Sequence, residues 1–332
     1  MRALLIIVLA LGTLWGGYWV VGSIGLQRTA EAWFAAQNER GVEAGYSDLA
    51  VQGFPNRFDL TVTDVHLADP VTGYGWDAPF AQVLSMTWKP WHLIAALPNR
   101  QTVTTPDQEI VVESSTLRGS LVMVPGVALA LDAVILEGAD LVATSGMGWT
   151  LKAARAQLAT RQTASLPNGH EVNLTLSGLV PDPAFLAAAG DLPAQIETTQ
   201  IDVSVGFTAP IDRFAADSKP QLTAMTVKQG LVRWGDLKIS VTGDVVAGAD
   251  GLAEGQIDIE MTNWRKILPV AVAMGLITAE VAPTVENMLG LLAEQSADPT
   301  VLSLPLKMTA GRMSIGPLPI GPAPRMIAGP QG

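Results

Sequence analysis

The chain of 332 residues contains no cysteine, and its histidines number only three. The first absence excludes cysteine nucleophiles, iron–sulfur clusters and zinc sites built from thiolates. The histidines, His66, His92 and His170, lack the short spacing of a metal-binding pair. The sequence also lacks a Gly-x-Ser-x-Gly elbow, a phosphate-binding loop and a dinucleotide fingerprint. We therefore expect a protein without catalytic activity, cofactor or bound metal.

Charged side chains are scarce as well. They make up 15% of the chain, whereas hydrophobic residues make up 48%; roughly a quarter of an average soluble protein is charged. Such a composition excludes intrinsic disorder, because a large apolar surface has to be buried. The net charge of −11 repels phosphate backbones, so nucleic acid is excluded as a partner. It also repels anionic membrane surfaces, so that membrane attachment cannot depend on a basic patch.

A long uncharged segment covers residues 3–24. As a helix, about 20 apolar residues cross the hydrocarbon of a bilayer, which is about 30 Å thick. Trp15, Tyr18 and Trp19 lie toward the far end, where aromatic belts occur, and Arg2 favours a cytoplasmic N-terminus. A cleaved signal peptide is the alternative, but its apolar core would be shorter and VGSIGLQ matches a cleavage site only weakly. We expect an uncleaved transmembrane anchor over residues 1–25, with residues 26–332 outside the cytoplasm.

Short alternating runs dominate the rest of the chain. Val172, Leu174 and Leu176, for example, alternate with Asn173, Thr175 and Ser177. This alternation is typical of an antiparallel sheet with one packed and one solvated face. The sequence predicts a mainly β, β-rich α+β protein with an extended antiparallel meander, and it leaves open whether the sheet forms a sandwich or a curled groove. Further runs of this kind begin at Phe58, Ile201, Leu237, Ile257 and Leu302.

Two or three helices are expected to pack on this sheet. Residues 26–41 read as a short helix that follows the anchor. Residues 181–189 read as another, with Asp182 as the N-cap. A helical insertion is predicted at about residues 263–296. The Pro-rich stretch at 316–322 predicts an edge strand or a surface arm, because proline cannot donate to a central ladder.

The stretch GFPNRF begins one of the predicted strands. Gly53 allows a bend, and Pro55 restricts both its own φ and the residue before it. Phe54 and Phe58 are expected to pin this bend into the core. We interpret the stretch as a strand corner in which Arg57 pairs with a carboxylate or with carbonyl groups. The alternative is that Arg57 meets a lipid headgroup, since a guanidinium suits phosphate.

Aromatic residues recur in WKPW, where Trp88 and Trp91 bracket Lys89. Such rings can fill the edges of a sheet, stack on a ligand or rest at a membrane interface. We favour the first interpretation for the tryptophans in general, and regard this pair as the best candidate for an exception.

Asp64 and His66 would share one face of a strand, with Asp69 close behind in the sequence. A weak metal site is conceivable from this spacing. We favour the simpler interpretation, a solvated strand end that carries polar side chains on its wet face.

Taken in order, the anchor, the motif from Gly53 to Phe58, the Trp88-Lys89-Pro90 stretch and the segment from Gly316 to Pro319 resemble a proteobacterial envelope family known as domain of unknown function 2125. More distantly, the chain is similar to AsmA-type envelope proteins, which share an anchor, meandering strands and an early Gly-x-Pro-x-Arg motif. The resemblance covers nearly the whole chain and brings no catalytic residues. It implies a single-pass protein of the bacterial inner membrane, with most of the chain in the periplasm. The AsmA-type similarity implies lipid handling or outer-membrane assembly.

Three functions remain as hypotheses: lipid handling or envelope assembly, a scaffold that binds other envelope proteins through sheet edges, and an enzyme. An open apolar cleft would favour the first over the second, and converging polar groups in a cleft would favour the third. The partners expected are the inner membrane and, beyond it, lipid or envelope proteins. The candidate binding or structural residues are Gly53, Phe54, Pro55, Arg57, Phe58, Trp88, Lys89 and Trp91.

Overall fold

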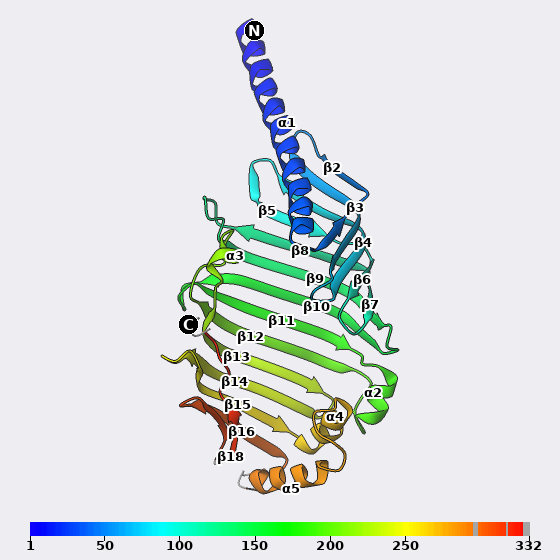
Figure 1. Cartoon of the computed structure of the whole chain (residues 1–332), viewed down its shortest axis with the longest axis vertical. Helices are drawn as coiled ribbons and strands as arrows, with labels where there is room; N and C mark the ends of the chain where they lie inside the picture. Colours follow the sequence, from blue (N-terminus) through cyan, green and yellow to red (C-terminus); the bar gives the residue numbers. More distant parts are fainter. Residues whose placement is uncertain (295–297, 317, 328–332) are drawn as a thin grey trace. The chain divides into compact units, whose positions relative to one another are not determined.

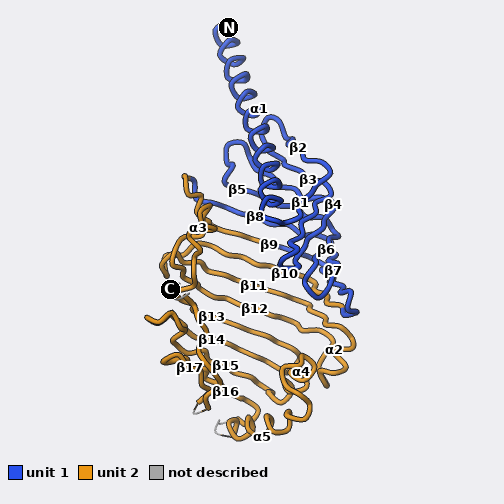
Figure 2. The backbone as a smooth tube through the Cα atoms, in the orientation of Figure 1, with its two compact units in different colours: residues 1–125, 136–149 blue, residues 126–135, 150–332 orange. Residues whose placement is uncertain are grey.

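The computed structural model describes residues 1–294, 298–316 and 318–327. It confirms a mainly β, antiparallel architecture with an apolar N-terminal helix. Contacts divide the chain into two compact units, which Figure 2 colours separately. A domain boundary at residue 25 stays a prediction. Unit 1 holds residues 1–125 and 136–149, and unit 2 holds residues 126–135 and 150–332.

The N-terminal helix, α1 (Arg2–Glu39), is one uninterrupted element of 38 residues. The predicted anchor and the predicted helix at 26–41 are therefore joined, which corrects the expectation of two separate segments. No proline lies between them to remove a backbone donor, and the polar residues after Gly25 are mostly good helix formers. The helix ends just before Gly41, whose φ of +87° suits glycine.

The strands of unit 1 pair antiparallel in one sheet: β1 (Glu43–Gly45), β2 (Asp48–Gln52), β3 (Arg57–Asp69), β4 (Tyr74–Met86), β5 (Lys89–Ala96), β6 (Arg100–Thr104), β7 (Glu109–Glu113), β8 (Thr116–Met123) and residues 136–145 of β9 (Leu131–Ser145). β3 and β4 form a long hairpin whose register runs from Arg57 opposite Met86 to Asp69 opposite Tyr74. β1 and β2 pair with the free side of β3. β4 pairs with β6 near its start and with β5 near its end.

Unit 2 is a meander in which each strand pairs antiparallel with the next: β10 (Thr150–Thr163), β11 (Gly169–Leu179), β12 (Ile196–Phe207), β13 (Leu222–Trp234), β14 (Leu237–Ala247), β15 (Ala253–Thr262), β16 (Val301–Thr309), β17 (Arg312–Ile315) and β18 (Leu318–Pro322). Figure 1 shows β10 to β16 side by side as the rungs of a ladder. β18 pairs only with β17 among the described strands, as the Pro-rich tail predicts, although Pro317 lies outside the described residues.

Short helices lie at the ends of the unit 2 strands: α2 (Pro183–Ala188), α3 (Ala215–Ser218), a 3-10 turn η1 (Trp264–Lys266), α4 (Ile267–Ala273) and α5 (Ala282–Ala293). The helix predicted at 181–189 is confirmed, and Asp182 caps it by accepting the amide of Ala184 at 2.8 Å. The predicted insertion is confirmed as η1, α4 and α5, while residues 295 and 296 of it lie outside the described part. α3 was not predicted.

One part of the core of unit 2 lies beneath these helices, and another part packs Val245, Ile257 and Met308 against Ala323 near the C-terminus. Trp264, Leu302 and Leu237 are at most 1% exposed, and they pack with residues of α2, α4 and α5. The described strands of each unit belong to a single sheet, so no second sheet covers the apolar face within either unit. The sandwich that the sequence left open is therefore not formed by the described residues within either unit.

Candidate functional site

The GFPNRF stretch forms a tight turn directly before β3. The amides of Asn56 and Arg57 both donate to the carbonyl of Gly53, at 3.2 and 2.9 Å. Gly53 has a φ of +101°, and a Cβ there would lie 2.9 Å from the carbonyl oxygen of Arg57. Only glycine fits this position without strain. The expected strand corner is thus present.

This turn binds the helix α1. The indole of Trp15 donates to the carbonyl of Pro55 at 3.0 Å, and the indole of Trp19 donates to the carbonyl of Arg57 at 2.7 Å. The hydroxyl of Tyr18 donates to the carbonyl of Thr87, in the turn between β4 and β5, at 2.7 Å. We call the two turns, residues 53–56 and 87–88, the helix collar.

Aromatic packing reinforces the helix collar. Phe58 is 6% exposed, and its ring centroid lies 6.3 Å from that of Trp19 and 6.2 Å from that of Tyr18. It fits against Gly22, where a Cβ would come within 2.5 Å of the ring. Phe54 meets Trp19 edge to face at 5.3 Å, yet stays 61% exposed. Phe58 is thus a core residue, as expected, whereas Phe54 is a surface residue, contrary to expectation.

The remaining candidate residues, Arg57, Trp88, Lys89 and Trp91, lie in or next to the two turns of the helix collar. Arg57 pairs with the carboxylate of Asp59 at 2.8 Å, which confirms the expected carboxylate partner. The side chain of Arg57 is 55% exposed. Trp88 is 55% exposed and Lys89 is exposed too, whereas Trp91 is half-buried on β5. Trp88 therefore does not fill the sheet edge, and Trp91 lies on a strand that pairs with β4 and with β8.

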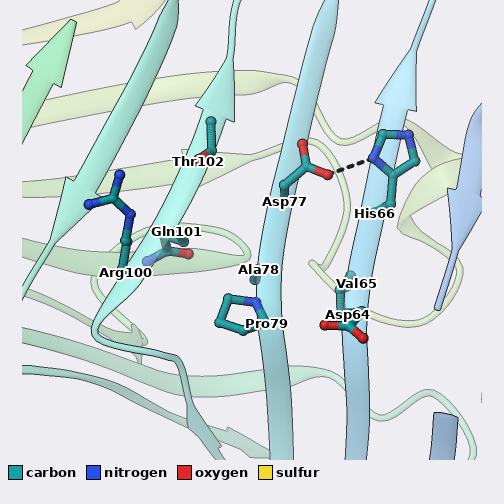
Figure 3. A pocket seen from close by; sticks show the side chains of 9 residues that line it. All are labelled: Asp64, Val65, His66, Asp77, Ala78, Pro79, Arg100, Gln101 and Thr102. Atoms are coloured by element: carbon teal, nitrogen blue, oxygen red, sulfur yellow. Dashed lines mark hydrogen bonds and ion pairs between the residues drawn. The ribbon is translucent and has the colours of Figure 1, made fainter. Parts of the chain in front are cut away.

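The polar residues around His66 line a shallow depression of about 360 Å³ in unit 1, drawn in Figure 3. His66 contacts the carboxylate of Asp77 on β4 at 2.6 Å, as the dashed line shows. Asp64 instead accepts from the hydroxyl of Ser47 at 2.8 Å. Arg100 pairs with a residue outside the depression, Glu113, at 2.7 Å.

Asp69, the third residue of the conceivable metal site, lies apart from Asp64 and His66 in its contacts. Asp69 accepts from the hydroxyl and backbone amide of Thr72, and this hydroxyl is the main cause that lowers its pKa. Asp64, His66 and Asp69 thus bind three separate partners and do not converge. Among the described residues no group of three metal-ligating side chains is close enough to hold a metal ion. The arrangement fits a solvated strand end.

A second candidate site is the apolar side of the unit 2 sheet. Cross-strand pairing aligns Leu158 with Leu174, and Leu174 with Ile201. The same row continues through Gly230, Val241, Ile259 and Leu304 on the next four strands. Strand alternation predicted the runs that contain Leu174, Ile201, Val241, Ile259 and Leu304, and the register now joins them into continuous rows.

Burial changes along these rows. Leu304, at the end beneath α5, is 8% exposed, whereas Ile201 is 39% exposed. The apolar residues on β10, β11 and β12 around Ile201 are all only half-buried. No helix or sheet in the described part of unit 2 buries them as Leu304 is buried. We call these residues the apolar face: Leu158, Val172, Leu174, Leu176, Ile201 and Val203.

His170 marks one end of the apolar face, because it follows the same alternation as Val172. It is 4% exposed. Burial lowers the pKa of His170 below its usual range, and the carboxylate of Asp132 opposes this shift. On the opposite, polar face Glu171 pairs with Lys228 and Arg161, each at 2.7 Å. The two faces of the sheet thus differ sharply in polarity.

Comparison with known protein families identifies the family to which the chain belongs. The model of a family described as uncharacterized proteins conserved in bacteria (DUF2125) matches residues 19–324. The chain belongs to this family. The match begins at Trp19 and so includes the collar contacts of Trp19, Gly22 and Phe58. No curated protein and no solved structure was found to match this DUF2125 chain.

Sequence reasoning missed the side of the helix to which the collar binds. Trp15, Tyr18, Trp19 and Gly22 recur at i, i+3, i+4 and i+7, which places them on one stripe of α1. The spacing was visible in the sequence and could have shown that this stripe contacts protein. No sequence pattern indicated that the apolar face would be only half-buried, because apolar and polar residues alternate in the same way in covered and in uncovered strands.

Proposed function

We propose that this protein is a single-pass, periplasm-facing protein of the bacterial inner membrane that handles lipid without catalysing a reaction. The acyl chains would lie on the apolar face of β10, β11 and β12. The observation that carries the proposal is the set of apolar rows that run buried beneath the helices and emerge half-exposed around Ile201. Exposed apolar patches of this kind mark sites of interaction.

The membrane anchor is supported by how α1 is used. The helix is long and apolar enough to cross a membrane. Beyond residue 25 its stripe continues through Leu26, Ala30 and Phe34, which pack on the β-sheet of unit 1. Cleavage near residue 25 would remove the aromatic partners of Phe58 and expose its ring. An uncleaved helix therefore serves both as anchor and as part of the folded unit.

Photo-crosslinking can test the lipid site on the full chain in nanodiscs. A phospholipid with a diazirine in its acyl chain should label peptides of β11 and β12 in addition to α1. Ile201→Glu and Val203→Glu place a charge on the apolar face and should abolish the sheet label while α1 remains labelled. Labelling of α1 alone in the unaltered protein would refute the proposal.

Val246→Glu provides the matched control. Val246 is 50% exposed and alternates with the buried Val245, so it lies on the opposite side of the sheet. The same charge there should leave the sheet label intact. Ile201 is the safer of the two test positions because it is already 39% exposed, so its replacement should spare the fold. Thermal melting of each variant verifies this.

The scaffold hypothesis would use sheet edges instead. The described edge strand β18 exposes Leu318 and Ile320, at 45% and 46%, but it also carries Pro319 and Pro322. Prolines on an edge hinder the addition of a further strand. This composition supports lipid handling over edge-mediated binding at this strand. Loss of a copurifying protein on Ile320→Glu, which places a charge on this edge, without any lipid label in the unaltered chain, would favour the scaffold.

A further inference from the structure

We propose that the helix collar is immersed in the membrane interface, so that Phe54 and Trp88 contact lipid on the side of the bilayer away from the N-terminus. The inference assumes that α1 spans the membrane, but it does not depend on a lipid site in unit 2. It assigns the lipid bilayer as the partner of the collar.

The position of the collar along α1 carries the inference. With Arg2 at one boundary, about 30 Å of hydrocarbon takes up roughly 20 residues, to about residue 22. At 1.5 Å per residue, Trp15, Tyr18 and Trp19 then lie about 10, 6 and 5 Å inside the far boundary. Their side chains bind the carbonyls of Pro55, Thr87 and Arg57. Segments held this closely must lie at or below the boundary.

The hydrogen bonds of the collar suit a site with little water. Backbone groups without a partner cost several kcal/mol in hydrocarbon, so irregular segments at that depth need partners from protein. The contacts with α1 supply them: three side-chain donors of the helix are satisfied by two carbonyls of the turns and by the carbonyl of Arg57 at the start of β3. The amide and hydroxyl of Thr87 also donate to the carbonyl of Asn56, which ties the two turns to each other.

The exposed side chains of the collar have the composition of a membrane interface. Phe54 is 61% exposed and Trp88 is 55% exposed, and aromatic rings favour this depth. Arg57 directly follows the turn at 53–56, and Lys89 directly follows the turn at 87–88. Both side chains are exposed, which places two cations where phosphate groups lie. Asp59 already neutralises Arg57 in part. A collar that served only to hold the helix in water would have no need to leave both rings uncovered.

Single-cysteine labelling tests the depth directly, because the natural chain contains no cysteine. Phe54→Cys and Trp88→Cys are each labelled with an environment-sensitive fluorophore, and the full chain is placed in nanodiscs with or without lipids that carry a quencher on the acyl chain. Both labels should show a blue-shifted emission that the quencher lipids reduce.

Val71→Cys is the matched control. Val71 is apolar and 90% exposed, but it lies in the turn at the other end of β3 and β4. The adjoining end of β3 pairs with β1, and Asn38 at the far end of α1 binds the carbonyl of Ala44. This end therefore lies about 24 Å beyond residue 22 along the helix, and its label should stay red-shifted and unquenched.

The three labelled positions give distinguishable outcomes. Labels at 54 and 88 that behave like the label at 71 would overturn the proposal. Quenching at only one of them would overturn immersion of both turns. Thermal melting of each labelled variant in the nanodisc shows whether the variant is folded. If one of the two collar variants does not fold, the label at the other collar position tests the proposal. Crosslinks of lipid to β11 and β12 are measured separately and do not affect this result.

Discussion

Replacement of Gly22 by alanine probes how tightly α1 is held against the β-sheet of unit 1. The new Cβ would lie 2.5 Å from Cζ and 3.0 Å from Cε1 of Phe58, whereas ordinary contacts are 3.4–4 Å. The ring has little space to retreat, since it is 6% exposed and packs between Trp19 and Tyr18. Overpacking of this kind costs about 1–3 kcal/mol of unfolding free energy.

Gly17→Ala makes the same chemical change in the same apolar helix. A Cβ at Gly17 would meet nothing within 4 Å. Any gain in helix propensity is shared by both variants and cancels in the comparison. Thermal unfolding of the full chain in nanodiscs should therefore show Gly22→Ala melting several degrees below Gly17→Ala, at roughly 3 °C per kcal/mol for a unit of this size.

A double variant assigns the loss to the ring. Phe58→Leu removes the rigid edge that the new Cβ at position 22 would strike, so Gly22→Ala should cost less in that background than in the natural one. The reasoning is refuted if Gly22→Ala melts like Gly17→Ala, or if its cost is the same whichever residue occupies position 58.

Three further changes have expected outcomes. Arg57→Ala should lower the unfolding free energy by less than about 1 kcal/mol in chemical denaturation, because the side chain of Arg57 is 55% exposed and solvent screens its attraction to Asp59. The side chain of Asp59 is only 14% exposed, so a larger loss would mean that this carboxylate needs Arg57 as its partner. Burial lowers the pKa of His170 below the usual 6.5, so the unfolded chain binds a proton that the folded chain rejects. Stability should fall as the pH drops below 6.5, and His170→Gln should flatten this dependence in urea titrations. Hydrogen bonds, first from Lys228, lower the pKa of Glu171 below the usual 4.5. Its contribution is present above pH 4.5 and lost as the pH falls through the lowered value, so Glu171→Gln should reduce acid sensitivity there.

Local pattern was sufficient for the elements themselves. Alternation in runs such as Val172 to Leu176 predicted strands because side chains of a strand point to opposite faces in turn. Asp182 predicted a helix start because its side chain satisfies a free backbone amide. The absence of cysteine and the uncharged segment at 3–24 predicted an anchor and a core without disulfides. The strand and capping inferences depend on residues within a few positions of one another, and the anchor and the absence of disulfides follow from composition alone.

The sequence by itself determined most of the secondary structure, the apolar side of the strands with clear alternation and the segment able to cross a membrane. Only the tertiary structure decided that Phe54 is exposed while Phe58 is buried, that the collar binds α1 at Trp15, Tyr18 and Trp19, and that the sheet stays open around Ile201. The physical reason is the range of the interactions. Alternation and capping act between neighbours in the chain, whereas burial depends on which distant segment covers a surface, and residues that alternate identically can end beneath α5 or at the surface.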